Sequence, residues 1–138
     1  MTVACTAYTL GLEKLTMGEL LDTLDRLRVL AVVDVRPPAL AAVPPTPGRL
    51  AEELAAAGLG FRSLGWRLVD AGPELPAVLG EVMAMAADAP CALVCIEAEP
   101  GRCHRSKVLA PALEAAGARV VHVLPDGRLR RHQPALGL

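Results

Sequence analysis

Aromatic residues are scarce in this 138-residue chain, which contains one tyrosine, one phenylalanine and one tryptophan. A platform of aromatic side chains that stacks single-stranded nucleic acid is therefore not expected. No apolar run approaches the roughly 18 residues that span a bilayer. The N-terminus "MTVACTAYTLG" also lacks the basic start and long apolar segment of a secretory signal. We expect a cytoplasmic protein that does not associate with membranes.

The four cysteines form no recognisable disulfide framework, and no Cys-x-x-Cys pair occurs. We interpret them as reduced thiols. The spacing of Cys95, Cys103 and His104 matches no standard zinc finger or ribbon. We therefore expect neither a metal nor a cofactor.

Apolar residues make up 53% of the chain, and many of them are alanine. A chain of this length fits one domain, here residues 1–138, with a core built from small side chains. Its charge is uneven: residues 1–99 carry 7 basic and 13 acidic side chains, whereas residues 100–138 carry 7 basic and 2 acidic ones. This asymmetry indicates either an anion-facing end or a solvated basic surface.

Strand-like and helix-like segments alternate along the chain. Short Val-rich or apolar runs predict strands near residues 2–8, 29–35, 59–64, 91–96 and 118–124. Between them, the sequence predicts helices after the capping box at Thr16, after Thr46-Pro47, over residues 75–86 and over about 105–116. This order predicts a single α/β domain with three layers: a mainly parallel sheet of about five strands and helices on both faces.

Polar residues follow the predicted strands at their carboxyl ends, where ligands bind in such folds. Asp34 and Arg36 follow one strand, and residues 97–105 follow another. Glu97 follows a buried strand at once and needs a cation or hydrogen-bonding partner, because an unpaired buried carboxylate is costly. We predict that it faces Arg36 across neighbouring strand ends, with Asp34 nearby. The same features would also fit a purely structural ion pair.

The alternation of a strand places Cys91, Cys95 and Glu97 on one side. Cys91 is interpreted as a core residue, whereas Cys95, at the strand tip, is either a core residue or a nucleophile. Cys103 lies where the loop enters the last helix, and the first turn of a helix favours anions and thiolates.

Three basic side chains surround Cys103: Arg102, His104 and Arg105. We therefore predict an anion site at this helix start, with Cys103 more reactive than Cys95. The alternative is that Cys103 packs beneath the helix and the arginines are surface charges.

The pattern C-x-E-x5-C-H-R resembles the hallmark of the family catalogued as domain of unknown function 488. Its residues here are Cys95, Glu97, Cys103, His104 and Arg105. Further similarity lies around Tyr8, at "VDVR" (33–36), at Leu64-Gly65 and at "VVHVLPDG" (120–127), so it covers nearly the whole chain.

The resemblance implies a compact Rossmann-like domain of the bacterial cytoplasm without a settled activity, and it adds Tyr8 to the candidate binding residues. Two features depart from it: the segment "PPALAAVPPTPG" after Arg36, and Pro111 inside the last helix, which predicts a kink or a late helix start. A weaker similarity to rhodanese-type sulfurtransferases rests on the "DVR" strand end and a strand-tip cysteine.

Three functions remain open from the sequence. The first is an enzyme or binding protein for an anionic or nucleotide-like small molecule, with Glu97 as acid or base and Cys103 or Cys95 as nucleophile. For this first function, the binding groups would be Asp34, Arg36, Arg102, His104 and Arg105. The second is a non-catalytic module for nucleic acid or nucleotides, and the third is thiol redox or sulfur transfer. The sequence does not decide whether the protein is an enzyme, nor its oligomeric state.

Overall fold

A computed structural model describes residues 5–13, 15–37, 40, 43–68, 74–96 and 104–132, apart from the side chains of residues 66, 68 and 104–107. The strands are β1 (Thr6–Gly11), β2 (Ala31–Asp34), β3 (Gly60–Ser63), β4 (Cys91–Cys95), β5 (Arg119–Val123) and β6 (Leu129–Arg131). The α-helices are α1 (Met17–Arg26), α2 (Pro47–Ala56), α3 (Leu75–Met85) and α4 (His104–Ala115), and a short 3-10 helix η2 spans Gly65–Leu68. No helix in these ranges is both long and apolar enough to cross a membrane.

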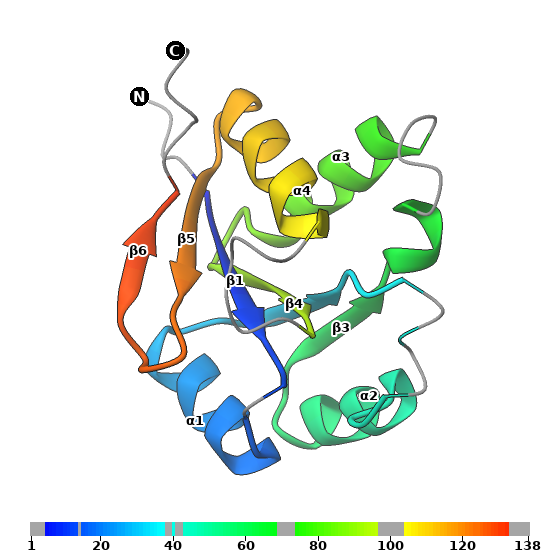
Figure 1. Ribbon diagram of the computed structural model, residues 1–138, viewed down its shortest axis with the longest axis vertical. Coiled ribbons are helices and arrows are strands. Elements are labelled where there is room, and N and C mark those ends of the chain that lie inside the picture. The colour runs from blue at the N-terminus through cyan, green and yellow to red at the C-terminus, as the bar shows by residue number, and fades with distance from the viewer. Residues whose placement is uncertain are drawn as a thin grey trace.

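The strands form one sheet in the order β3-β2-β4-β1-β5-β6 (Figure 1). The first five pair in parallel, and only β6 pairs antiparallel, with β5. β4 is buried along its whole length between β1 and β2. The predicted α/β class and the mainly parallel sheet are confirmed.

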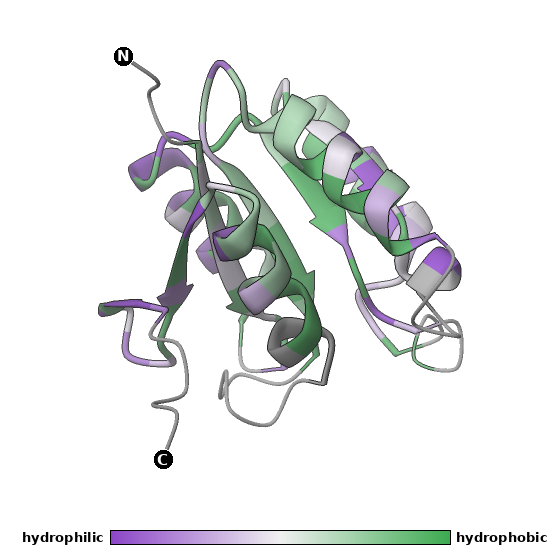
Figure 2. Cartoon of the chain, turned by 90° about the horizontal axis from the view of Figure 1, so that it is seen from above, coloured by the Kyte–Doolittle hydropathy of each residue, from purple (hydrophilic) through white to green (hydrophobic). Residues whose placement is uncertain are grey.

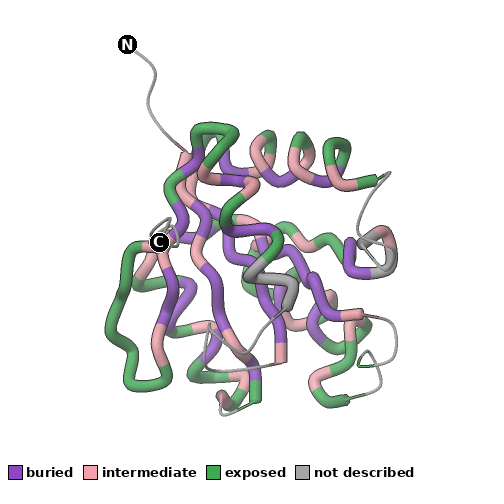
Figure 3. Tube along the Cα trace, turned by 45° about the horizontal axis from the view of Figure 1, so that its top comes forward, coloured by how far each residue is buried: buried purple, intermediate pink, exposed green. Residues whose placement is uncertain are grey.

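Two apolar cores cover the two faces of the sheet, as strand alternation predicts. Cys91, Leu93 and Cys95 of β4 pack with α3 and α4, whereas Ala92 and Val94 pack with α1 and α2. Figure 1 shows α3 and α4 above the strands and α1 and α2 below them. The interior strands are apolar and buried, and the polar positions lie on the outer surface (Figures 2 and 3). The helices therefore form the two outer layers of a three-layer domain.

Local sequence determines where α1 and α2 begin. The N–H of Glu19 donates to the Thr16 hydroxyl at 3.1 Å, and the N–H of Thr16 donates to the Glu19 carboxylate at 2.9 Å, which completes the predicted capping box. Thr46 caps α2 with a single bond, in which its hydroxyl accepts from the Arg49 N–H at 3.3 Å, and Pro47 lies in the first turn. Both caps lie at the carboxyl edge of the sheet, so they also fix the chain around the candidate site.

Three features of the fold differ from the sequence prediction. The first strand spans Thr6–Gly11 and so ends three residues beyond the predicted residue 8, because pairing with β4 and β5 selects the segment that alternates between the two cores; residues 2–4 of the prediction lie outside the described residues. β6 was not predicted, since its three residues are all exposed and carry no apolar pattern. α4 begins at His104 and continues through Pro111, so of the two expected effects, a kink or a late helix start, the late start is wrong. Pro111 is exposed, and its ring points away from the core.

Gly65 holds η2 against the end of β2. A Cβ at this position would lie 1.8 Å from the carbonyl oxygen of Arg36 and 2.9 Å from the carbonyl carbon of Val35. Those atoms belong to the backbone and cannot move aside as a flexible side chain would. The N–H of Leu64 also donates to the Asp34 carbonyl at 3.0 Å. The absence of a side chain at Gly65 therefore sets how closely β3 and η2 approach the segment that carries Arg36.

We expect Gly65→Ala to lower the free energy of unfolding by roughly 2–3 kcal/mol, because the added methyl group forces the two backbones apart. Urea denaturation followed by circular dichroism measures this change. Gly80→Ala is the matched control, since Gly80 lies within α3 and nothing approaches its Cβ position within 4 Å. It should stabilise the protein by about 0.5–1 kcal/mol. Equal effects of the two substitutions would contradict this account.

Candidate functional site

The carboxyl ends of β1, β2 and β4 meet at one edge of the sheet. Backbone hydrogen bonds continue the parallel pairing past the strands: Leu12 N–H donates to the Cys95 carbonyl at 2.8 Å, and Val35 N–H donates to the Val94 carbonyl at 3.0 Å. The chain after β1 and β2 leads to helices on one face, and the chain after β4 leads to α4 on the other face. The connections therefore diverge on both sides of β4, the arrangement that opens a ligand crevice in doubly wound folds.

A buried ion pair ends β2. The Arg36 guanidinium donates from Nε to both oxygens of Asp34, at 2.9 and 3.1 Å, and from Nη2 to Oδ2 at 2.7 Å. The backbone N–H of Arg36 donates to Oδ1 at 3.0 Å, and Nη1 donates to the Val43 carbonyl at 3.1 Å. Both side chains are 1% exposed. This geometry closes a tight Asp-x-Arg turn and ties it to the segment before α2.

Several predicted site residues fall outside the described residues: Glu97, Arg102 and Cys103, together with the side chains of His104 and Arg105. The predicted pairing of Glu97 with Arg36 therefore stays a prediction. Asp34 does lie beside Arg36, as its direct partner. The Arg36 guanidinium is neutralised by this carboxylate and almost wholly buried, so in the described structure it serves the turn and not a ligand.

The described cysteines differ in position. Cys91 is fully buried within β4, and burial raises its pKa to about 12, which makes it a poor nucleophile. Cys95 ends the same strand, is 6% exposed, and its thiol donates to the Leu10 carbonyl at 3.8 Å. Cys5 is partly buried beside the α3–α4 core. Cys91 therefore fits its interpretation as a core residue. Among the described cysteines, Cys95 is the one that lies at the carboxyl edge of the sheet.

Tyr8 lies within β1 rather than at its end. It pairs in register with Ala92 and Val121 and packs against the α1–α2 core. Two residues separate it from Gly11, which ends the strand. Its role in binding stays a prediction from the resemblance alone.

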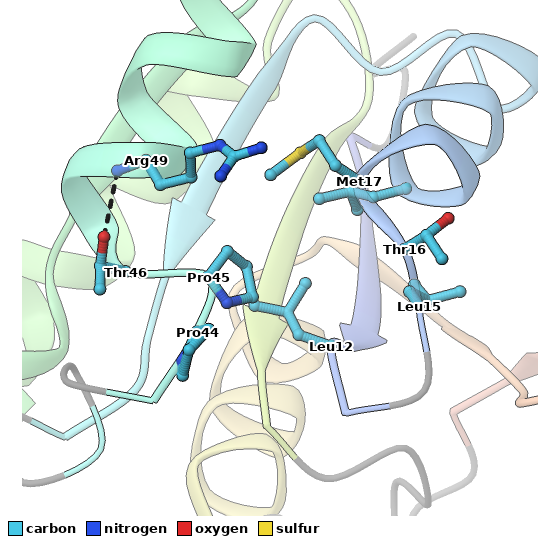
Figure 4. Close-up of a pocket in the computed structure, with 9 residues that line it drawn as sticks. Leu12, Leu15, Thr16, Met17, Pro44, Pro45, Thr46 and Arg49 are labelled. Carbon is cyan, nitrogen blue, oxygen red and sulfur yellow. Dashed lines mark hydrogen bonds between the residues drawn. The ribbon is translucent and has the colours of Figure 1, made fainter.

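A pocket that the sequence did not reveal opens at the same edge, between the starts of α1 and α2 (Figure 4). Its volume is about 390 Å³. Apolar side chains supply most of its lining: Leu12, Leu15, Met17, Leu20, Pro44 and Pro45. Thr16, Thr46 and Arg49 complete it. Its residues come from two connections far apart in sequence, so no local pattern could have indicated it.

A second polar group that the sequence did not indicate lies at the β5–β6 edge. Thr9 Oγ1 and His122 Nδ1 are 2.5 Å apart, and His122 Nε2 lies 3.1 Å from His132 Nδ1. Burial lowers the pKa of His122 to about 4, helped by His132 and Arg130 and opposed by Glu114. His122 is therefore neutral at pH 7, which suits a buried hydrogen-bonded chain.

Within the described ranges, no group of three or more His, Cys, Asp or Glu side chains could hold a metal ion. No protein-family model, curated protein or solved structure matches the chain. The functional interpretation therefore depends on the geometry of the carboxyl edge.

We expect Asp34→Ala to lower the free energy of unfolding by about 3–5 kcal/mol, because it leaves a buried guanidinium unpaired. The double variant Asp34→Leu, Arg36→Met should recover most of this loss, since no buried charge then remains. Chemical denaturation of the single and double variants measures both effects.

Asp126 provides the matched control, because it forms the same Asp-x-Arg turn with Arg128 in an exposed position. Asp126→Ala should change stability little, since solvent screens that pair. If both aspartate variants had similar effects, burial would not be what makes the Asp34 pair important.

Stability should also depend on pH through His122. Because its pKa is about 4 in the folded protein and near 6.5 when unfolded, the unfolded state binds the extra proton first as pH falls. The free energy of unfolding should therefore fall by about 2–3 kcal/mol from pH 6.5 to pH 4. His122→Gln should flatten this slope. An NMR titration of the His122 ring that gives a pKa near 6.5 would contradict the prediction.

Proposed function

We propose that this domain binds a small anionic ligand, organic or nucleotide-like, at the carboxyl edge of β1, β4 and β2. The observation that carries this proposal is the divergence of the connections around β4, with the buried Asp34–Arg36 pair at the same edge. In doubly wound sheets the crevice at such a point is where ligands bind.

The sequence supplies the groups that would recognise the anion. Arg102, His104 and Arg105 surround the start of α4, which the structure places at His104. The dipole and the N–H groups of a first helical turn favour negative charge. Glu97 would act as the acid or base, and Cys103 as the nucleophile, if the bound ligand is also a substrate.

The resemblance to domain of unknown function 488 supports the same residues. Its C-x-E-x5-C-H-R pattern begins at Cys95, which ends the central strand β4. We infer membership of that family from the pattern, as part of the proposal.

Two alternatives receive less support from the described residues. Sulfur transfer through Cys95 would need an accessible thiolate, whereas this thiol is buried and donates to a carbonyl. Nucleic-acid binding would use the basic C-terminal region, but Arg128 pairs with Asp126 and Arg131 pairs with Glu114. Those carboxylates reduce the positive field that a phosphate backbone would meet.

Alkylation kinetics test the proposal. At pH 7 we expect iodoacetamide to modify Cys103 faster than Cys95, because the start of α4 favours the thiolate. Inorganic phosphate should slow the alkylation of Cys103, because it would occupy the same helix start. The rate of each cysteine is read by mass spectrometry of peptides. Cys91, with its pKa of about 12, is the internal control for general unfolding. A Cys103 rate equal to that of Cys95, or unchanged by phosphate, would refute the anion site.

A further inference from the structure

The pocket between α1 and α2 shares its walls with the proposed site. Leu12 lines the pocket, and its N–H donates to the carbonyl of Cys95, the last residue of β4, at 2.8 Å. On the other side, the Val43 carbonyl accepts from Arg36 Nη1 at 3.1 Å, and the next residue, Pro44, lines the pocket. A ligand at the carboxyl edge would therefore have this pocket directly beside it.

The described lining suits a hydrocarbon better than a base with several hydrogen-bonding edges. Leucine, methionine and proline side chains dominate it. The Thr16 and Thr46 hydroxyls already accept from the N–H groups of Glu19 and Arg49, at 3.1 and 3.3 Å. Each hydroxyl therefore keeps one lone pair and its own O–H, which gives the pocket two small polar contacts. Among the described lining residues no side-chain amide or carboxylate is present to read the polar edge of a base.

Arg49 is the charged side chain in the described lining. Its Nε donates to Glu53, one turn further along α2, at 3.2 Å. Figure 4 shows its guanidinium extending across the pocket toward Met17. In the described structure its two terminal nitrogens have no acceptor, so they are available to an anion at the pocket. The start of α2, whose first turn carries no acidic residue, borders the same space and adds to the positive potential, whereas Glu19 offsets the start of α1.

We propose that this pocket binds the apolar body of a small amphipathic anion, an organic phosphate or carboxylate with one aryl or short alkyl group. Arg49 pairs with its charge. This inference rests on the proposed function, since it assigns a chemical class to the ligand of the carboxyl edge. The volume of the pocket agrees with a ligand of this size. A cavity of about 150 Å³ accommodates benzene, so a pocket of about 390 Å³ has room for one ring and its anionic group.

Methyl NMR of the full chain, with ¹³C-methyl methionine, tests the inference with phenyl phosphate, inorganic phosphate and phenol as probes. Phenyl phosphate should shift the Met17 methyl signal saturably. Met83 and Met85 pack against the opposite core, so their signals should not move. Inorganic phosphate lacks the apolar body and phenol lacks the charge, so each should bind at least ten-fold more weakly.

Two variants on the exposed side of α2 separate charge from packing. Arg49→Gln should raise the Kd for phenyl phosphate at least ten-fold. Glu53→Gln removes the competing carboxylate and should leave the Kd equal or lower it. Both positions are partly exposed, so the variants should retain the wild-type melting temperature. A silent Met17 signal, an Arg49→Gln variant with unchanged Kd, or phenol binding as tightly as phenyl phosphate would each overturn the inference.

The two proposals fail in different ways. If phosphate protects Cys103 but phenyl phosphate leaves Met17 unmoved, the anion site stands and the pocket inference is wrong. If phenyl phosphate moves Met17 in an Arg49-dependent manner while phosphate leaves Cys103 unprotected, the pocket binds its ligand without the start of α4.

Discussion

Arg36 lies in the interior at 4% exposure, where an unpaired guanidinium would cost several kcal/mol. The Asp34 carboxylate offsets that cost with a bidentate pair and a bond to the backbone of Arg36. Because the pair is buried, its geometry is fixed, and the structures bonded to it are fixed as well. The Val43 carbonyl is held by Nη1, and Gly65 packs against the Arg36 carbonyl. One ion pair thereby positions the end of β2, the entry to α2 and the turn after β3.

The same pair connects the two parts of the candidate site. Through Val43 it positions Pro44 and Pro45, which form one wall of the pocket, while Leu12 forms another wall and is bonded to the end of β4. A change at Arg36 would therefore alter the pocket as well as the strand ends. An Arg-Asp turn fixes direction as well as distance, which a site assembled from three connections requires.

The sequence predicted those parts of the fold that depend on neighbouring residues. Thr16 and Glu19 form their capping box within one helical turn, and the alternation in β4 determines which side chains enter each core. It also indicated that Asp34 and Arg36 lie together. What it missed depends on tertiary pairing: β6 is specified by its register with β5, and the contact between Gly65 and Arg36 joins segments 29 residues apart. The pocket combines side chains from two connections, so periodicity and spacing carry no information about it.

The scarcity of aromatic residues constrains what this edge can recognise. With one tyrosine, one phenylalanine and one tryptophan in the chain, stacking is not available along the described pocket, whose lining contains none of the three. Apolar contact there comes from leucine, methionine and proline, which adapt to the shape of a ligand but do not read hydrogen-bonding edges. Selectivity must then come from volume and from the placement of charge. Arg49 provides that charge at the pocket, so the arrangement selects for the sign of a ligand more than for the identity of its ring.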